Sequence, residues 1–226
     1  MSFHLTENRY PGKFVTFEGI DGSGKSDQFR MIRDVLVAMI GTNVVFTKEP
    51  PNNSVGVEIY DILRGVHPTI KFESLSALEM QRKYFLARRM HYQDLNIPAL
   101  KAGVHVFSDR GVLSVAYGIN DITELDRFWA VQKAMFEYHK VPFIAPDLNL
   151  IYDVDVDIAL ERLGKKERAR DKLEQRESLE RARANYLAIA GQVPNCLIID
   201  GTPPVEEVFE VTKQNIFRIL GLNEEA

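Results

Sequence analysis

The chain has 226 residues, of which 45% are hydrophobic, so it is long and apolar enough for the core of one α/β domain. Its 28 basic and 32 acidic residues give a net charge of −4, which argues against general nucleic-acid binding because that function favours a basic face. A single cysteine excludes an internal disulfide. The sequence has neither a run of about 20 apolar residues nor an N-terminal signal segment. We therefore expect a soluble cytoplasmic protein with no membrane partner.

Short apolar runs that predict strands alternate along the chain with segments of helical periodicity. The predicted strands are 13–18, 43–47, 104–108, 148–153 and 196–200. The predicted helices are 27–40, 54–64, 74–101, 122–140, 155–163, 171–190 and 204–220. Strands that alternate with helices indicate an α/β fold, in which helices cover both faces of a five-stranded parallel sheet. We therefore expect a single domain over residues 1–226.

The first predicted strand leads into a glycine-rich loop, Gly19-Ile20-Asp21-Gly22-Ser23-Gly24-Lys25-Ser26. This loop fits the pattern G-x-x-x-x-G-K-[ST] of the P-loop, which binds the phosphates of a nucleoside triphosphate. Its glycines let backbone N–H groups turn toward phosphate oxygens, and the following helix directs its positive end at them. In such a loop Lys25 reaches the β- and γ-phosphates of ATP, and the Ser26 hydroxyl is a ligand of Mg²⁺. Strand, loop and helix in this order predict a three-layer P-loop NTPase fold.

Charged residues stand where four of the predicted strands end. They are Glu18, Lys48, Glu49, Asp109, Arg110 and Asp153. Ligands of open α/β sheets bind at the carboxyl ends of the strands. We therefore expect these side chains to converge around the phosphate loop, although they are far apart in the sequence.

The segment from Arg162 to Lys172 is rich in charge. Most runs of this kind are solvated helix ends whose charges pair at i, i+4. Its position after the fourth strand favours a second interpretation, a short lid at about 163–172 that brings a cation to the transferring phosphoryl group. Because the phosphate loop contains no arginine, we expect Arg168 or Arg170 to supply that charge.

Further motifs occur in a fixed order along most of the chain. They are Phe17–Ser26, Thr47–Pro50, Tyr84–Arg88, Ile97–Leu100, Ser108–Arg110, Ser114–Tyr117, Pro146–Leu148, Asp171–Gln175 and Arg183–Leu187. Together they resemble the motifs of the thymidylate kinases (dTMP kinases), a family of P-loop nucleoside monophosphate kinases. The resemblance implies transfer of the γ-phosphate of ATP to dTMP with Mg²⁺. It also implies a homodimer.

The resemblance also implies roles for individual residues. Arg110 would hold the acceptor monophosphate with help from Lys48, and Asp21 would bind the sugar hydroxyl. Tyr84 would stack on the acceptor base, and Arg88 would hydrogen-bond to its edge. The implied acceptor site is Asp21, Lys48, Glu49, Tyr84, Arg88, Arg110 and Tyr117; the implied catalytic set is Lys25, Asp109, Arg110, Arg168 and Arg170; the implied metal ligands are Ser26 and Asp109.

The residues alone leave simpler interpretations open. Tyr84 could belong to the core, Arg88 could pair with an acid at the surface, and Asp109 with Arg110 could form an ion pair at a strand end.

Several positions depart from the family pattern. The family sequence T-R-E-P-G-G-T is replaced by Thr47–Asn53, which loses both glycines and has lysine in place of arginine. Gly111 replaces the tyrosine of D-R-Y, the spacing to Tyr117 is one residue shorter, and Asp27 and Ala87 replace a threonine and an aspartate. These departures leave two alternatives open: a related kinase with a different acceptor (another monophosphate or a nucleoside), or a nucleotide-binding module with weak catalysis.

Overall fold

Five parallel strands form one sheet in the computed structural model, which describes residues 5–164 and 173–223. The strand order is β2-β3-β1-β4-β5. Their bounds are β1 Phe14–Glu18, β2 Val44–Lys48, β3 His105–Asp109, β4 Leu148–Asp153 and β5 Cys196–Asp200. Each strand begins and ends within one residue of its predicted range, and the predicted five-stranded parallel sheet is confirmed.

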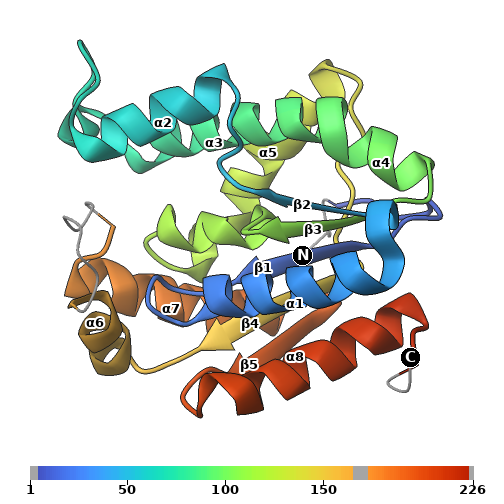
Figure 1. Ribbon diagram of the computed structural model, residues 1–226. Helices are drawn as coiled ribbons and strands as arrows, with labels where there is room; N and C mark the ends of the chain where they lie inside the picture. The colour runs from blue at the N-terminus through green and yellow to red at the C-terminus, as the bar shows by residue number, and fades with distance from the viewer. Residues whose placement is uncertain (1–4, 165–172, 224–226) are drawn as a thin grey trace.

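Eight α-helices lie in the described residues, and Figure 1 shows how they surround the sheet. Their bounds are α1 Lys25–Ile40, α2 Ser54–Arg64, α3 Ala77–His91, α4 Ile97–Lys101, α5 Leu125–Tyr138, α6 Val156–Gly164, α7 Arg176–Ala190 and α8 Val205–Leu220. Short 3₁₀ segments cover Gly41–Asn43, Phe72–Ser74, Val112–Tyr117 and Ile122–Glu124. None of the described helices is both long and apolar enough to cross a membrane.

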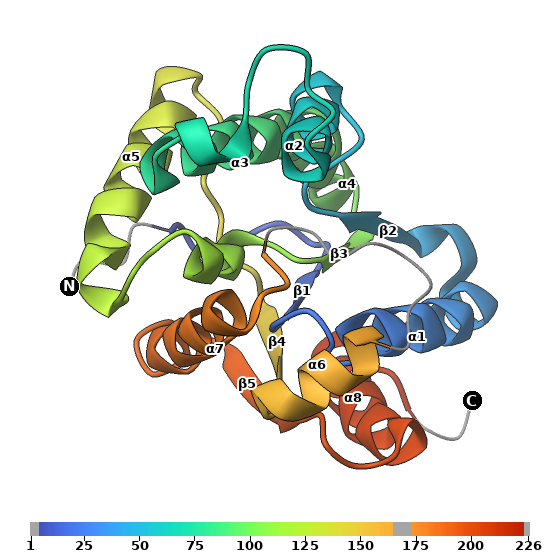
Figure 2. The ribbon, with the colours of Figure 1, turned by 90° about the vertical axis from the view of Figure 1, so that its left-hand side faces the viewer.

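The sheet carries a separate hydrophobic core on each face. Successive side chains of a strand point to opposite faces, so in β1 Phe14 joins one core and Phe17 the other. On the Phe17 face, Ile32 of α1 and Ile216 of α8 pack against the sheet. Helices α3, α5 and α7 cover the Phe14 face. Figure 2 looks along the sheet and shows α1 and α8 on one side with α5 and α7 on the other, which is the three-layer arrangement predicted from the sequence.

The predicted continuous helix over 74–101 was wrong in one respect, because the structure interrupts it. Helix α3 ends at His91, a π-helical turn covers Tyr92–Asn96, and α4 begins at Ile97. Pro98 explains the interruption. Proline lacks an N–H, and its ring would clash with the carbonyl group four residues earlier in a regular α-helix. The wider π turn accommodates the proline and lets the segment continue in the same direction.

A smaller core joins α2 to α3 above the carboxyl ends of the strands. It contains Ile59 and Ile62 of α2 with Met80 and Ala87 of α3, all buried. This contact holds α3 in place beside the strand ends, and Met80 also lines the second cavity described below.

Candidate active site

The glycine-rich loop connects β1 to α1, as the sequence predicts. Gly22 and Gly24 have φ angles of 86° and 91°, in the left-handed region that glycine adopts without strain. A Cβ at Gly22 would lie 2.4 Å from the Ala159 carbonyl oxygen, so a side chain has no room there. The loop ends at Lys25, the first residue of a 16-residue helix whose N-terminus favours anions.

A cavity of about 430 Å³ lies over this loop. It is lined by Asp21, Gly22, Ser23, Gly24, Lys25, Ser26, Asp27, Gln28, Arg162, Gly201, Pro203, Val205 and Val208. We call it the donor cavity. Gly19 and Ile20 do not line it, and the Ile20 side chain is buried in the core. Asp27 is exposed and pairs with Arg30 at 3.0 Å, and an acid in the first helical turn is favourable for the helix dipole.

Ser26 and Asp109 meet at the edge of the donor cavity. The Ser26 hydroxyl donates to Asp109 Oδ2 at 3.1 Å, while the buried Asp109 Oδ1 has no hydrogen bond among the described residues and lies 3.9 Å from Lys25 Nζ. A hydroxyl and a carboxylate are oxygen ligands that suit Mg²⁺, which takes few protein ligands and completes its shell with phosphate and water oxygens. The described residues contain no group of three or more His, Cys, Asp or Glu side chains that could hold a metal by themselves. The residues present therefore fit Mg²⁺ that binds together with a nucleotide.

Arg110 directly follows β3, at the carboxyl ends of the strands. Its Nη2 is 2.5 Å from Asp21 Oδ1, and its Nη1 donates to the Gly19 carbonyl oxygen at 3.1 Å. The guanidinium also lies 5.0 Å from the centre of the Tyr117 ring, whose hydroxyl donates to Asp21 Oδ2 at 3.1 Å. Arg110 therefore pairs with Asp21 of the phosphate loop and not with its neighbour Asp109.

The pKa of Asp21 reflects this arrangement. Burial acts to raise it, but the positive charges of Arg110 and Lys25 dominate and hold the pKa of Asp21 well below its ordinary value. Lys25 Nζ is 3.6 Å from the same carboxylate. The loop thus holds an ionised carboxylate between two cations.

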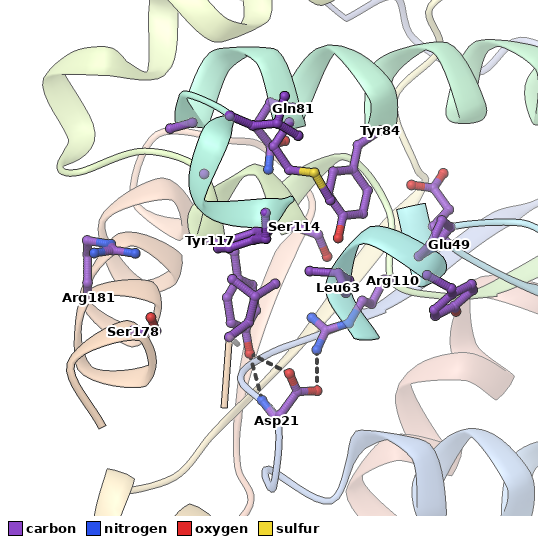
Figure 3. Close-up of a pocket in the computed structure, with 18 of the residues that line it drawn as sticks. Asp21, Glu49, Leu63, Gln81, Tyr84, Arg110, Ser114, Tyr117, Ser178 and Arg181 are labelled. Carbon is purple, nitrogen blue, oxygen red and sulfur yellow. Dashed lines mark hydrogen bonds and ion pairs between the residues drawn. The ribbon is translucent and has the colours of Figure 1, made fainter. Parts of the chain in front are cut away.

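A second cavity, of about 410 Å³, opens on the other side of Arg110 (Figure 3). Its polar lining includes Asp21, Glu49, Gln81, Tyr84, Arg88, Arg110, Ser114, Tyr117, Asn120, Ser178 and Arg181; its apolar lining includes Leu63, Phe72, Leu75, Met80 and Leu173. We call it the acceptor cavity. Asp21 lines both cavities, so the two meet at the phosphate loop. A cavity of this size with an aromatic and apolar wall suits a nucleotide base.

Comparisons with known proteins agree with this geometry. A family model described as thymidylate kinase matches residues 17–211. A thymidylate kinase of Janthinobacterium sp. is 35% identical over 202 residues, covering 88% of this chain and 93% of the relative, and one of Geobacillus sp. is 33% identical over 214 residues, covering 89% and 94%. The chain belongs to the thymidylate kinase family. A crystal structure of thymidylate kinase from Ehrlichia chaffeensis shares the fold, with a TM-score of 0.67 at 24% identity and coverage of 91% of this chain and 98% of that one.

In this member of the thymidylate kinase family, Arg88 forms a buried ion pair. Its Nε donates to Glu49 Oε2 at 2.6 Å and its Nη2 donates to the Gly111 carbonyl oxygen at 2.8 Å. Only 2% of Arg88 is exposed, so the alternative of a surface pair was wrong. Burial raises the pKa of Glu49 to about 7, against the opposing charge of Arg88. The remaining nitrogen, Nη1, is buried without a hydrogen-bond partner in the described part of the chain.

The sequence did not predict that helix α7 contacts Arg110. The Tyr186 hydroxyl of α7 accepts from Arg110 Nη1 at 3.3 Å and donates to Glu18 Oε2 at 3.0 Å. Ser114 also donates to Glu18 Oε2, at 2.7 Å. Burial raises the pKa of Glu18, against the hydrogen bond from Ser114. Tyr186 lies within the family motif Arg183–Leu187, but nothing local in that motif indicates which residue its hydroxyl would meet.

Four of the expected residues need separate mention. Lys48 does not line the acceptor cavity: its side-chain nitrogen lies 5.2 Å from the centre of the Tyr60 ring, and Tyr60 does line the cavity. Asp153 was expected among the converging strand ends, but it pairs with Arg183, at 2.7 Å, and lines neither cavity. The expected lid arginines, Arg168 and Arg170, lie outside the described residues.

Two departures from the family pattern have a structural reason. Asn53, in place of the last threonine of T-R-E-P-G-G-T, is the N-cap of α2: its Oδ1 accepts from the Gly56 backbone N–H at 2.9 Å. At Gly111, in place of tyrosine, a Cβ would lie 2.8 Å from Thr16 Cγ2. Of the altered segment 47–53, Glu49 and Pro50 line the acceptor cavity.

Proposed function

We propose that this protein transfers the γ-phosphoryl group of ATP to dTMP and forms ADP and dTDP. One observation carries the proposal: the donor and acceptor cavities meet at Asp21, with Lys25 on one side and Arg110 on the other. In-line phosphoryl transfer needs two anionic nucleotides brought end to end, with positive charge between them. The names of the family and of its relatives support dTMP as the acceptor.

The attacking group in this reaction needs no general base. The second pKa of a phosphate monoester is about 6, so the acceptor oxygen is already deprotonated at neutral pH. The protein contributes positioning and charge. Lys25 binds the β- and γ-phosphates, and Arg110 binds the acceptor phosphate with its planar pair of N–H groups.

The remaining residues of the acceptor cavity orient the nucleoside. Tyr84 provides a ring face against which the base stacks, Arg88 Nη1 donates to a carbonyl oxygen of the base, and Asp21 and Tyr117 lie beside the sugar. Ser26 and Asp109 would hold Mg²⁺. When bound, that ion neutralises the developing phosphate charge.

An assay of ADP release tests the proposal. ATP is combined with dTMP, dUMP, dCMP, dGMP, dAMP or thymidine in turn, and the rate without acceptor is subtracted. We expect dTMP to give the highest kcat/KM. A higher value for another monophosphate or for thymidine would establish a different acceptor, and ATP binding without acceptor-dependent ADP release would establish a non-catalytic module. The comparisons support neither alternative. The homodimer and the cytoplasmic location stay predictions.

A further inference from the structure

Gln81 presents its amide to the acceptor cavity. It lies in the second turn of α3, only 5% of the residue is exposed, and it lines the cavity beside Tyr84 (Figure 3). Within the described residues its side chain makes no hydrogen bond. Unlike the buried amide atoms of Gln132, those of Gln81 are accessible, so a molecule in the cavity can hydrogen-bond to them. The position of this accessible amide in the wall of a nucleotide-sized cavity indicates that a bound ligand hydrogen-bonds to it.

The amide lies in line with the two residues already assigned to the base. Gln81, Tyr84 and Arg88 are spaced i, i+3 and i+7, so they project from one face of α3. At 1.5 Å per residue, Gln81 and Arg88 start about 10 Å apart along the helix. This is roughly the width of a six-membered base with a hydrogen bond of about 3 Å on each side. A base stacked on Tyr84 therefore has Arg88 at one end and Gln81 at the other.

Both ends of this arrangement suit a pyrimidine with two carbonyl groups. Arg88 Nη1 can only donate, so it matches a carbonyl oxygen and rejects an exocyclic amino group. An amide offers one donor and one acceptor side by side. Thymine matches that pair with its N3–H and the adjacent carbonyl oxygen, whereas cytosine has two acceptors in those places.

The structure also limits where the Gln81 side chain can lie. A Cβ on Gly118 would lie 2.3 Å from Gln81 Cγ and 2.4 Å from Nε2, so the amide packs directly against the Gly118 backbone. Gly118 follows Tyr117 and has a φ of −97°, which any residue adopts. Glycine is therefore needed here for space and not for its backbone conformation.

We propose that Gln81 is a specificity-determining residue that pairs with N3–H and an adjacent carbonyl oxygen of the acceptor base, and so selects thymine or uracil over cytosine. The inference rests on the proposed function, since it concerns the acceptor of that reaction. Gln81 does not touch the reacting phosphate groups. Its loss raises the acceptor KM and leaves kcat nearly unchanged.

Gln81→Met, which keeps the length of the side chain and removes its hydrogen bonds, tests the proposal. We expect kcat/KM for dTMP to fall roughly 10- to 100-fold, the effect of leaving a buried N–H of the base unpaired. The value for dCMP should change much less, so the ratio between the two acceptors collapses. Gln132→Met is the matched control: Gln132 of α5 is fully buried, its side chain has no hydrogen bond among the described residues, and it does not line the cavity. The control should keep the wild-type ratio.

A second variant displaces the amide without changing it. Gly118→Ala would push the Gln81 side chain aside, so the ratio of dTMP to dCMP should fall here too, and this variant serves if Gln81→Met does not fold. Wild-type activity on dTMP with an unchanged ratio in the folded variants would overturn the role of Gln81 alone. Absence of wild-type activity on dTMP would instead overturn the proposed function.

Discussion

Replacing Arg110 with lysine tests the assignment of the acceptor phosphate most directly. The substitution keeps the positive charge and removes the planar fork of the guanidinium. In the structure the two terminal nitrogens act separately: Nη2 pairs with Asp21 at 2.5 Å, and Nη1 donates to the Gly19 carbonyl oxygen at 3.1 Å and to the Tyr186 hydroxyl at 3.3 Å. Position 110 has a φ of 73°, and lysine carries the same backbone strain as arginine there.

The size of the effect follows from these contacts. A single ammonium group cannot take both places, so at least one charge-assisted hydrogen bond to the acceptor phosphate is lost. Such a bond contributes about 1.5–3 kcal/mol, which corresponds to a rise in the acceptor KM of roughly 10- to 150-fold. The KM for ATP should hardly change, because Arg110 does not line the donor cavity.

Initial rates of ADP formation measure both constants, with dTMP titrated at saturating ATP and ATP titrated at saturating dTMP. Arg183→Lys is the matched control, since Arg183 makes a two-pronged pair with Asp153 at 2.7 and 3.0 Å outside both cavities. An acceptor KM equal to that of the wild type would refute the assignment. A fall in kcat alone, with thymidine active, would instead place Arg110 on the γ-phosphate.

Three further substitutions test the donor side, the lid and the buried ion pair. Lys25→Ala should lower kcat by a factor that corresponds to roughly 2.7–4 kcal/mol, the cost of removing a single oxyanion-hole donor; a single-turnover rate near that of the wild type would contradict this role. Replacing Arg168 and Arg170 together with alanine should lower kcat far more than it raises the KM for ATP, and an unchanged kcat would favour a solvated helix end. Glu49 has a pKa raised from its ordinary 4.5 to about 7, so the folded protein binds this proton more tightly than the unfolded chain. The stability that this proton contributes is fully present below pH 4.5 and is lost as the pH rises through about 7. Glu49→Gln should flatten that part of the pH profile of the free energy of unfolding, measured by denaturant titration at several pH values; equal slopes in both proteins would refute the assignment.

The fold could be predicted because its signals are local. The central strands of a parallel sheet are buried on both faces, so their sequences are short apolar runs bounded by polar residues, as in Leu148–Asp153. The helix over 74–101 was harder, since its apolar periodicity continues through the π-helical turn. The interruption was visible in the sequence only as Pro98.

The candidate site also has parts that local sequence predicts and parts that it does not. The phosphate loop and the dipeptide Asp109-Arg110 are short motifs. The structure brings both to the carboxyl ends of the strands. The partners of Arg110 and Arg88 could not be predicted, because Tyr186 and Glu49 are 76 and 39 residues away in the chain. Packing between distant elements decides such contacts, and no sequence pattern encodes them locally.

The negative charge of Asp21 pairs with the cations of both sites. Its carboxylate contacts Arg110, Lys25 and the Tyr117 hydroxyl, and it lines both cavities. In the proposed reaction Lys25 binds the donor phosphates and Arg110 binds the acceptor phosphate, so we expect each phosphate to compete with Asp21 for one positive partner. The phosphate loop of this protein therefore carries an acid that keeps Lys25 and Arg110 paired, and we expect the charge of the bound nucleotides to take over that pairing.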